Sequence, residues 1–209
     1  MPNQKLPELP ELKFEEQTHT YTLNSAKLPS VTTVMRPLSN TCYGGIDKAV
    51  LNEAAKRGTA VHQAIENFLL YEIDDCPIEL GGYYRAFKAW FTETKPLVLA
   101  TETKIYHKFF RYACTADLLC LIDGKVTLID FKTTTVSIDA LLRVQLHAYE
   151  RAFSSHGFEI EQKSALLLGK DGEWHFKYFP KSNTETHEVF ASLLALENYK
   201  QKYFKEAAL

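Results

Sequence analysis

The chain has 209 residues, of which 45% are hydrophobic and 24% charged, and its formal net charge is −2. This composition is typical of a folded globular protein with one sizeable core. A charge so close to zero excludes nucleic-acid recognition by a uniformly basic surface, so local patches would have to provide it. The sequence has no secretion signal and no apolar stretch of the roughly 20 residues that span a membrane. Its four cysteines form no CxxC pair. We therefore expect reduced thiols and a cytoplasmic location.

The N-terminal part predicts small elements. Residues 1–12 are rich in proline, and we expect them to be extended or flexible. The stretch HTYTLNSAKLPSVT alternates polar and apolar residues and predicts a small hairpin that turns at Asn24-Ser25. Ser30 is placed to cap a short helix that continues to about Met35 and ends at Pro37.

Hydrophobic periodicity divides the rest of the chain into helices and strands. In chain order we expect helices over 46–71 and 82–94, strands over 97–109, 112–122 and 125–133, a helix over 140–155 capped by Ser137 or Asp139, a hairpin of strands 164–169 and 173–180, and a helix over 184–205. No linker separates two domains, so residues 1–209 predict a single domain with its motifs between about 46 and 180. This order predicts an α/β (α+β) fold with a central mixed β-sheet flanked by helices.

The segment DLLCLIDGKVTLIDFKT, residues 117–133, predicts a β-hairpin with charges in its apolar strands. A two-residue turn at Asp123-Gly124 would place Asp117 opposite Asp130, with Lys132 on the same face. Two opposed carboxylates repel each other and are costly to bury without a cation. Lys132 supplies one positive charge, and hard oxygen ligands favour Mg²⁺ or Mn²⁺ as the other. The alternative is an edge hairpin whose charged residues face solvent.

Two predicted helices carry polar residues at a spacing of four. Gly58, His62 and Glu66 share one face of the first, and Gln145 and Tyr149 share one face of another. Glycine costs about 1 kcal/mol relative to alanine in a helix interior, so close approach of another backbone would explain Gly58 and would give His62 a target. Each stripe taken alone also fits an ordinary amphipathic helix.

Together these motifs resemble the PD-(D/E)XK nuclease superfamily. The matching residues are Gly58-x-x-x-His62, Asp117, Asp130-Phe131-Lys132 and Gln145-x-x-x-Tyr149. The sequence is most similar to the branch of RecB-like, mitochondrial genome-maintenance and phage exonucleases, over roughly residues 19–153. The branch implies a restriction-endonuclease-like core. Ala116 stands where many members have proline, and because no cysteine follows Cys120 we expect no iron–sulfur cluster.

The resemblance also implies roles for these residues. Asp117, Asp130, the backbone carbonyl of Phe131 and His62 would bind Mg²⁺ or Mn²⁺, and an imidazole ligand favours Mn²⁺. Lys132 would orient the attacking water and neutralise charge, and it could act as a base only with a strongly lowered pKa. Gln145 and Tyr149 would flank the site, touching the nucleic-acid backbone or positioning Lys132. Two carboxylates are candidates for a supporting or second-metal role: Glu66 and Glu102.

The resemblance implies metal-dependent exonuclease action on DNA ends, in phage-type recombination, repair or replication. A phage-encoded protein of this kind would act in the host cytoplasm. The candidate nucleic-acid contacts are Arg57, Lys104, Lys108, Arg111 and Arg143. Aromatic residues between 104 and 112 could stack on unpaired bases, whereas a buried aromatic face is the alternative for Phe109 and Phe110. Single-stranded DNA, duplex ends, a recombination or single-strand-binding protein and a second copy of the chain are the expected partners. The alternative functions are a structure-specific or nicking endonuclease and a non-catalytic binding subunit, with RNA as an alternative substrate.

Overall fold

A computed structural model describes residues 4–181 and 183–204. The strands are β1 (Leu12–Glu15), β2 (Thr20–Leu23), β3 (Ala26–Leu28), β4 (Leu97–Tyr106), β5 (Ala113–Ile122), β6 (Lys125–Lys132), β7 (Gln162–Leu168) and β8 (Trp174–Phe179). The helices are α1 (Val31–Tyr43), α2 (Lys48–Tyr71), a 3₁₀ turn η1 (Ile78–Leu80), α3 (Gly81–Thr94), α4 (Asp139–Ser154) and α5 (Thr184–Tyr203). Within this part of the chain, no helix is both long and apolar enough to cross a membrane.

The central sheet has five strands in the order β4-β5-β6-β7-β8. The β6–β7 pair is parallel and the other three pairs are antiparallel, so the sheet is mixed. A parallel pair needs a long crossover, and α4 supplies it between β6 and β7. The mixed sheet flanked by helices that the sequence predicted for a restriction-endonuclease-like core is confirmed.

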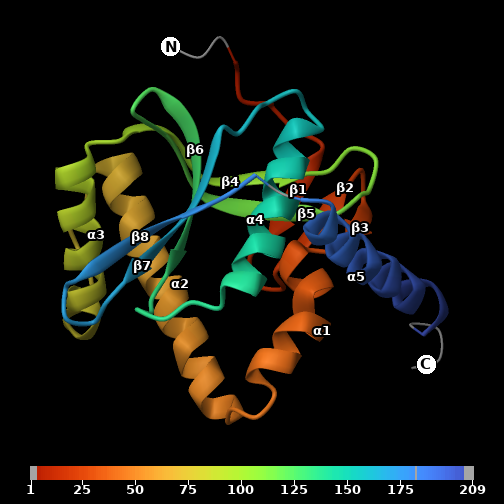
Figure 1. Cartoon of the computed structure of the whole chain (residues 1–209), viewed down its shortest axis with the longest axis horizontal. Helices are drawn as coiled ribbons and strands as arrows, with labels where there is room; N and C mark the ends of the chain where they lie inside the picture. Colours follow the sequence, from red (N-terminus) through yellow and green to blue (C-terminus); the bar gives the residue numbers. More distant parts are fainter. Residues whose placement is uncertain (1–3, 182, 205–209) are drawn as a thin grey trace.

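The sheet separates two apolar clusters. Residues of α1, α4 and α5 pack against one face of the sheet, around Leu128 and Phe153. Residues of α2 and α3 pack against the other face, around Phe87 and Trp90. Figure 1 shows α2 and α3 on one side of the sheet, and α4, α1 and α5 on the other. The central strand β6 lies between these two layers, so helices reach it from both faces of the sheet.

A second sheet of three strands, β1-β2-β3, lies beside β4 and β5. The predicted hairpin turn at Asn24 and Ser25 is confirmed, and both residues have the positive φ angles that a tight hairpin turn requires. Strand β1 was not predicted. Residues 4–12 also make contacts in place of the free segment expected for 1–12, because Leu6 and Leu9 pack against the first apolar cluster. Residues 1–3 lie outside the described residues.

Three predicted helix ends differ from the structure. Ser30 caps α1 as expected, its Oγ accepting the Thr33 N–H at 3.0 Å, but Pro37 lies inside α1. Burial of Val34 and Met35 in the core offsets the cost of that proline, which is about 3 kcal/mol. The α4 cap is Ile138, whose side chain makes no capping hydrogen bond. The helix predicted to reach 205 ends at Tyr203, and residues 205–209 lie outside the described residues.

Candidate metal centre

The β5–β6 hairpin has the predicted register over most of its length. Asp123 and Gly124 both have positive φ angles, and the five backbone pairs run from Ile122↔Lys125 to Leu118↔Ile129. The next pair in this register would be Asp117↔Asp130. There the strands separate instead, and the Phe131 N–H donates a 2.6 Å hydrogen bond to the Asp117 Oδ2. The Asp117 side chain thus takes the place of a backbone acceptor, which corrects the direct Asp117–Asp130 pairing expected from the turn.

Strand β5 changes its alternation at the same point. Successive residues of a strand normally face opposite sides of the sheet. Ala116 and Leu119 are three residues apart, yet both belong to the cluster on the α4 side, whereas Leu118 belongs to the cluster on the α2 side. This shift directs the Asp117 carboxylate toward α2, and the Thr101 hydroxyl donates to the Asp117 carbonyl at 2.9 Å.

The neighbouring strand β4 is also irregular there. Its pairs with β5 include Thr101↔Leu118 and Thr103↔Ala116, which leaves Glu102 beside Asp117. Glu102 has a φ of 46°, in the left-handed region that residues other than glycine rarely adopt. Such conformations cost roughly 1–3 kcal/mol and are concentrated at functional sites. The irregularity in β4 brings the Glu102 carboxylate to the place that Asp117 faces.

His62 of α2 completes a compact group with these two carboxylates. Its Nδ1 lies 3.6 Å from Asp117 Oδ1 and 4.0 Å from Glu102 Oε1. One potential ligand atom from each of the three residues lies within 4.8 Å of the other two. His62 Nε2 contacts the Phe131 carbonyl at 3.2 Å. A backbone carbonyl that fixes the far nitrogen of an imidazole is a common support for a metal-binding histidine.

Asp130 and Lys132 form the second part of the site. Lys132 Nζ lies 2.5 Å from Asp130 Oδ2, and Asp130 is 2% exposed. The Gln145 amide on α4 donates to Asp130 Oδ1 and to the Tyr149 hydroxyl, both at 2.9 Å. Both Asp130 oxygens are therefore held by neighbouring side chains. The structure brings the predicted residues Asp117, Asp130, Lys132, Gln145 and Tyr149 into one cavity with His62.

The electrostatics of the group favour a bound cation. Burial, with repulsion from Asp117 and Glu66, raises the pKa of Glu102 to about 8. Burial likewise raises the pKa of Asp117, and the Asp130 charge adds to this effect. Burial lowers the pKa of Lys132, but the Asp130 and Asp117 carboxylates together raise it by more than burial lowers it. The pKa of Lys132 is therefore above its ordinary value. Lys132 is therefore an ammonium at neutral pH, which argues against the role of general base.

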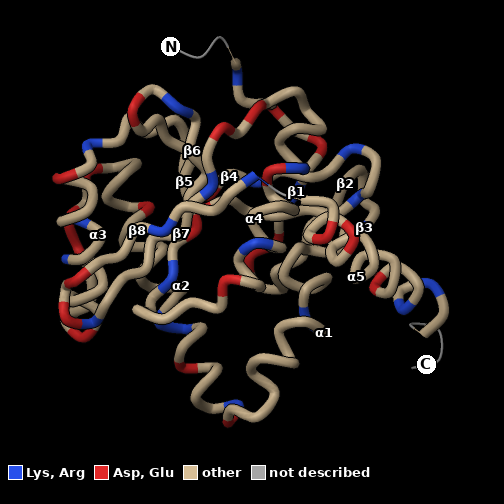
Figure 2. Tube along the Cα trace, viewed as in Figure 1, with Lys and Arg blue, Asp and Glu red and all other residues tan. Residues whose placement is uncertain are grey.

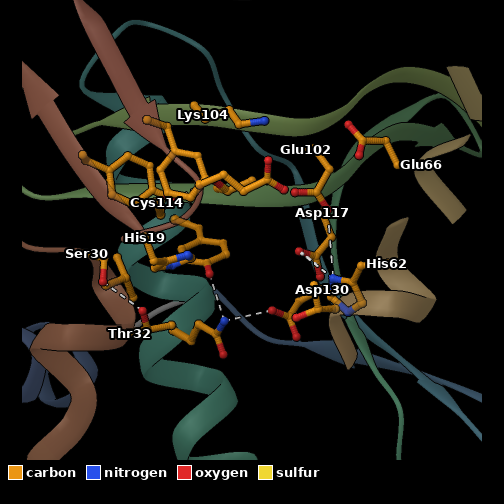
Figure 3. Close-up of a pocket in the computed structure, with 18 of the residues that line it drawn as sticks. His19, Ser30, Thr32, His62, Glu66, Glu102, Lys104, Cys114, Asp117 and Asp130 are labelled. Atoms are coloured by element: carbon orange, nitrogen blue, oxygen red, sulfur yellow. Dashed lines mark hydrogen bonds and ion pairs between the residues drawn. The ribbon is translucent and has the colours of Figure 1, made fainter. Parts of the chain in front are cut away.

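An imidazole nitrogen and two carboxylates are a donor set that suits Mn²⁺ or Mg²⁺, and a divalent cation would offset the repulsion between Asp117 and Glu102. The donor set thus fits the metal that the sequence predicts. It gives Glu102, expected only in a supporting role, a place in the compact group. The other two predicted ligands lie outside this group: Asp130 pairs with Lys132, and the Phe131 carbonyl contacts His62. Glu66 lies in the same cavity, near Glu102 (Figure 3).

The cavity that contains the site has a volume of about 880 Å³. One wall carries the compact group, and the opposite wall comes from the small sheet β1–β3 and the start of α1. Figure 3 shows His19, Ser30 and Thr32 on one side and His62, Glu102 and Asp117 on the other. The remaining residues of the small sheet that line the cavity are Leu12, Phe14, Glu16 and Tyr21. None of the site residues predicted from the sequence belongs to this sheet.

The five predicted nucleic-acid contacts are spread over the molecule. Lys104 lines the cavity, and Arg57 Nε contacts Thr133 Oγ1 at 3.4 Å just beyond β6. Lys108 and Arg111 lie in the turn between β4 and β5, and Arg143 lies over the Phe179 ring beside a separate cavity. Their contact with nucleic acid stays a prediction. Figure 2 shows Lys and Arg interspersed with Asp and Glu along the chain.

The alternative of a buried aromatic face is wrong for Phe109 and Phe110. Both lie in the turn between β4 and β5, and their side chains are 81% and 48% exposed. Gly58 also differs from expectation. A Cβ at this position would meet Thr133 Oγ1 at 3.9 Å, an ordinary contact, so no backbone approaches closely enough to require glycine. His62 nevertheless meets the β6 backbone one helical turn later, at the Phe131 carbonyl.

No family model and no curated protein matches the sequence. Among solved structures, the chain is similar to an alkaline exonuclease (LHK-Exo) from Laribacter hongkongensis, at 13% identity and a TM-score of 0.46, over 74% of this chain and 91% of that chain. Its complex with dAMP aligns at 13% identity and a TM-score of 0.45, over 87% and 93% of the two chains. The structure of SSO0001 aligns at 15% identity and a TM-score of 0.33, over 68% and 71%. Similarities at this level do not assign the chain to a family.

Proposed function

We propose that this protein is a metal-dependent deoxyribonuclease that hydrolyses phosphodiester bonds from DNA ends. The observation that carries the proposal is the meeting of His62, Glu102 and Asp117 in one cavity with the Asp130–Lys132 pair. Carboxylates and an imidazole would hold Mg²⁺ or Mn²⁺, and a cationic side chain stands beside them. This combination serves phosphoryl chemistry, in which charge on the phosphate must be neutralised.

The chain's own residues have distinct tasks in this proposal. His62, Glu102 and Asp117 would hold the metal, which when bound activates water and stabilises charge on the scissile phosphate. Lys132, kept protonated by Asp130 and Asp117, neutralises negative charge that develops on the phosphate. Gln145 fixes Asp130 and is itself aligned by the Tyr149 hydroxyl.

Arg57 and Lys104 are the cations best placed to hold the DNA backbone. Lys104 lines the cavity itself, and Arg57 is held near the end of β6 by Thr133. Such contacts are independent of base sequence and weaken with salt. The exonuclease mode is supported by the motif set Asp117, Asp130-Phe131-Lys132 and Gln145-x-x-x-Tyr149. Recombination, repair or replication in the cytoplasm, with a single-strand-binding or recombination protein as partner, is the setting that we propose.

End-labelled linear DNA and circular single-stranded DNA, each incubated with Mn²⁺ or Mg²⁺, test the proposal. We expect degradation of linear DNA, no cutting of circles, and loss of activity with EDTA. Lys132→Ala should be inactive. Lys88→Ala removes the α3 lysine that pairs with Asp74 and does not line the cavity, so this variant should retain activity. Cutting of circles would instead indicate an endonuclease, and binding without cleavage would indicate a non-catalytic subunit.

A further inference from the structure

We propose that Phe14 and His19 form a stacking surface for an unpaired base, through which the cleft selects single-stranded DNA over duplex ends. This inference rests on the proposed nuclease function and specifies its substrate. Both residues belong to the small N-terminal sheet and its β1–β2 connection, outside the motifs that the sequence connected with the site. Both line the cavity that holds His62, Glu102 and Asp117.

The two rings belong to a cluster with Tyr21. The Phe14 and Tyr21 ring centroids lie 4.5 Å apart, and His19 packs edge-on against Phe14 at 5.1 Å. Tyr21 is 2% exposed, Phe14 is partly buried and His19 is exposed. The cluster thus has a buried base and an accessible surface, and Figure 3 shows His19 extending into the cavity toward the side that carries Asp130.

This wall has a fixed position relative to the site. The Tyr21 hydroxyl lies 2.6 Å from Thr115 Oγ1, two residues before Asp117 on β5. The Tyr106 hydroxyl donates to Glu11 at 3.0 Å, so β4 is also connected to the segment that leads into β1. These two hydrogen bonds connect the ring wall to β5 and β4, the strands that carry Asp117 and Glu102. A strand whose phosphate reaches Lys132 would lie in the same cavity as the rings.

Stacking discriminates between substrates because it requires a base with a free face. In a duplex only the terminal pair has a free face, and its bases are held by pairing, whereas every base of a single strand can turn toward a protein ring. Base–aromatic stacking contributes about 1–3 kcal/mol per base and tolerates any base sequence. Lys104 lies in the same cavity and offers a cation for the adjoining phosphate. Rings and cation together are typical of single-strand binding sites.

The direct test is the stacking signal. A single-stranded oligonucleotide carrying 2-aminopurine at its end is titrated with full-length protein, with Ca²⁺ in place of Mn²⁺ so that binding is measured without cleavage. We expect fluorescence quenching with wild type and with His19→Phe, and a roughly tenfold weaker affinity with little quenching for His19→Ala and Phe14→Ala. Tyr199→Ala removes an exposed ring from α5, outside the cavity, and should behave as wild type.

Cleavage gives the second readout. With Mn²⁺, His19→Ala should lower kcat/KM for single-stranded DNA about tenfold and leave kcat/KM for a blunt duplex of the same sequence unchanged. The stacking role is refuted if His19→Ala behaves as Tyr199→Ala does, or lowers kcat/KM for both substrates equally. Because His19 is exposed, this variant should fold even if Phe14→Ala does not. Wild-type protein that cleaves neither substrate overturns the nuclease function, whereas the quenching assay still decides the stacking role.

Discussion

The Asp117 carboxylate accepts a 2.6 Å hydrogen bond from the Phe131 N–H at the point where β5 and β6 separate. This contact gives a buried donor its partner and opens the sheet next to Lys132. It also requires that a carboxylate be buried, which raises the pKa of Asp117. The same side chain therefore stabilises the backbone through its oxygen and destabilises the metal-free fold through its charge.

Asp117→Asn and Asp117→Ala should separate these two effects. Asparagine keeps an acceptor for Phe131 N–H without the buried charge, so its free energy of unfolding in EDTA should equal or exceed that of wild type. Alanine leaves the N–H unpaired and should be less stable than asparagine by about 1–3 kcal/mol. Both should lose at least about a hundredfold in cleavage rate. Urea denaturation and a linear-DNA assay measure these effects, and equal stabilities would show that the hydrogen bond contributes nothing.

Glu102 should make the stability of the metal-free protein depend on pH. Its folded-state pKa of about 8 exceeds the ordinary 4.5, so the folded chain holds this proton more tightly than the unfolded chain. The free energy of unfolding should then fall as pH rises from about 5 to about 8. Glu102→Gln should reduce this slope without abolishing it, because Asp117 titrates in the same direction.

Mn²⁺ should stabilise the protein more at about pH 8 than at about pH 5, because the metal competes with protons for the same carboxylates. Thermal melting with excess Mn²⁺ and with EDTA, at several pH values, measures both effects. A Tm increase that does not change with pH would contradict the assignment of Glu102 and Asp117 as ligands.

Gln145 should act on the reaction through Asp130. Its amide bridges Asp130 and the Tyr149 hydroxyl, so Gln145→Ala frees one Asp130 oxygen and should lower kcat by about 10–100-fold. Tyr149→Phe removes only the acceptor that aligns Gln145, and its effect on kcat should be smaller. Single-turnover cleavage of linear DNA distinguishes the two variants. A Tyr149→Phe defect as large as that of Gln145→Ala would assign the hydroxyl a more direct role.

Gly58→Ala should stabilise the protein by about 1 kcal/mol, because alanine is the better helix former. The added methyl would meet only Thr133 Oγ1 at 3.9 Å. Urea denaturation measures the change, and Gln63→Ala on the same helix serves as a control without a glycine. A loss of stability would show that the helix near Thr133 is packed more tightly than this distance indicates.

The hairpin was predictable because its turn chemistry is local. Asp123-Gly124 takes the two positive φ angles that fix the register, and this register places Asp117 and Asp130 near each other. Neither the turn residues nor the hydrophobic periodicity predicts that the pairing of β5 with β6 ends at Leu118↔Ile129. That separation depends on a side chain that replaces a backbone acceptor, which is a tertiary effect.

Other features could not be predicted because their cause lies outside the local sequence. Glu102 has a left-handed backbone conformation within β4, and no residue type near it in the sequence predicts that conformation. Strand β1 is only four residues long and follows a proline-rich stretch, so its own sequence gives little signal. It forms because it pairs with β2 and packs against β4. Pro37 is tolerated because α1 is buried against α4 and α5. The cavity wall formed by β1–β3 was not predicted either, because only the tertiary fold brings it next to β4 and β5.

The two apolar clusters on opposite faces of the sheet have a consequence for when activity can arise. His62 comes from α2 on one face, whereas Gln145 and Tyr149 come from α4 on the other. A folding intermediate with only one helical layer docked would hold at most part of the site. Such a chain would lack either His62 beside Asp117 or Gln145 beside Asp130. Under the proposed function, cleavage of DNA would be restricted to molecules in which both helical layers have docked on the sheet.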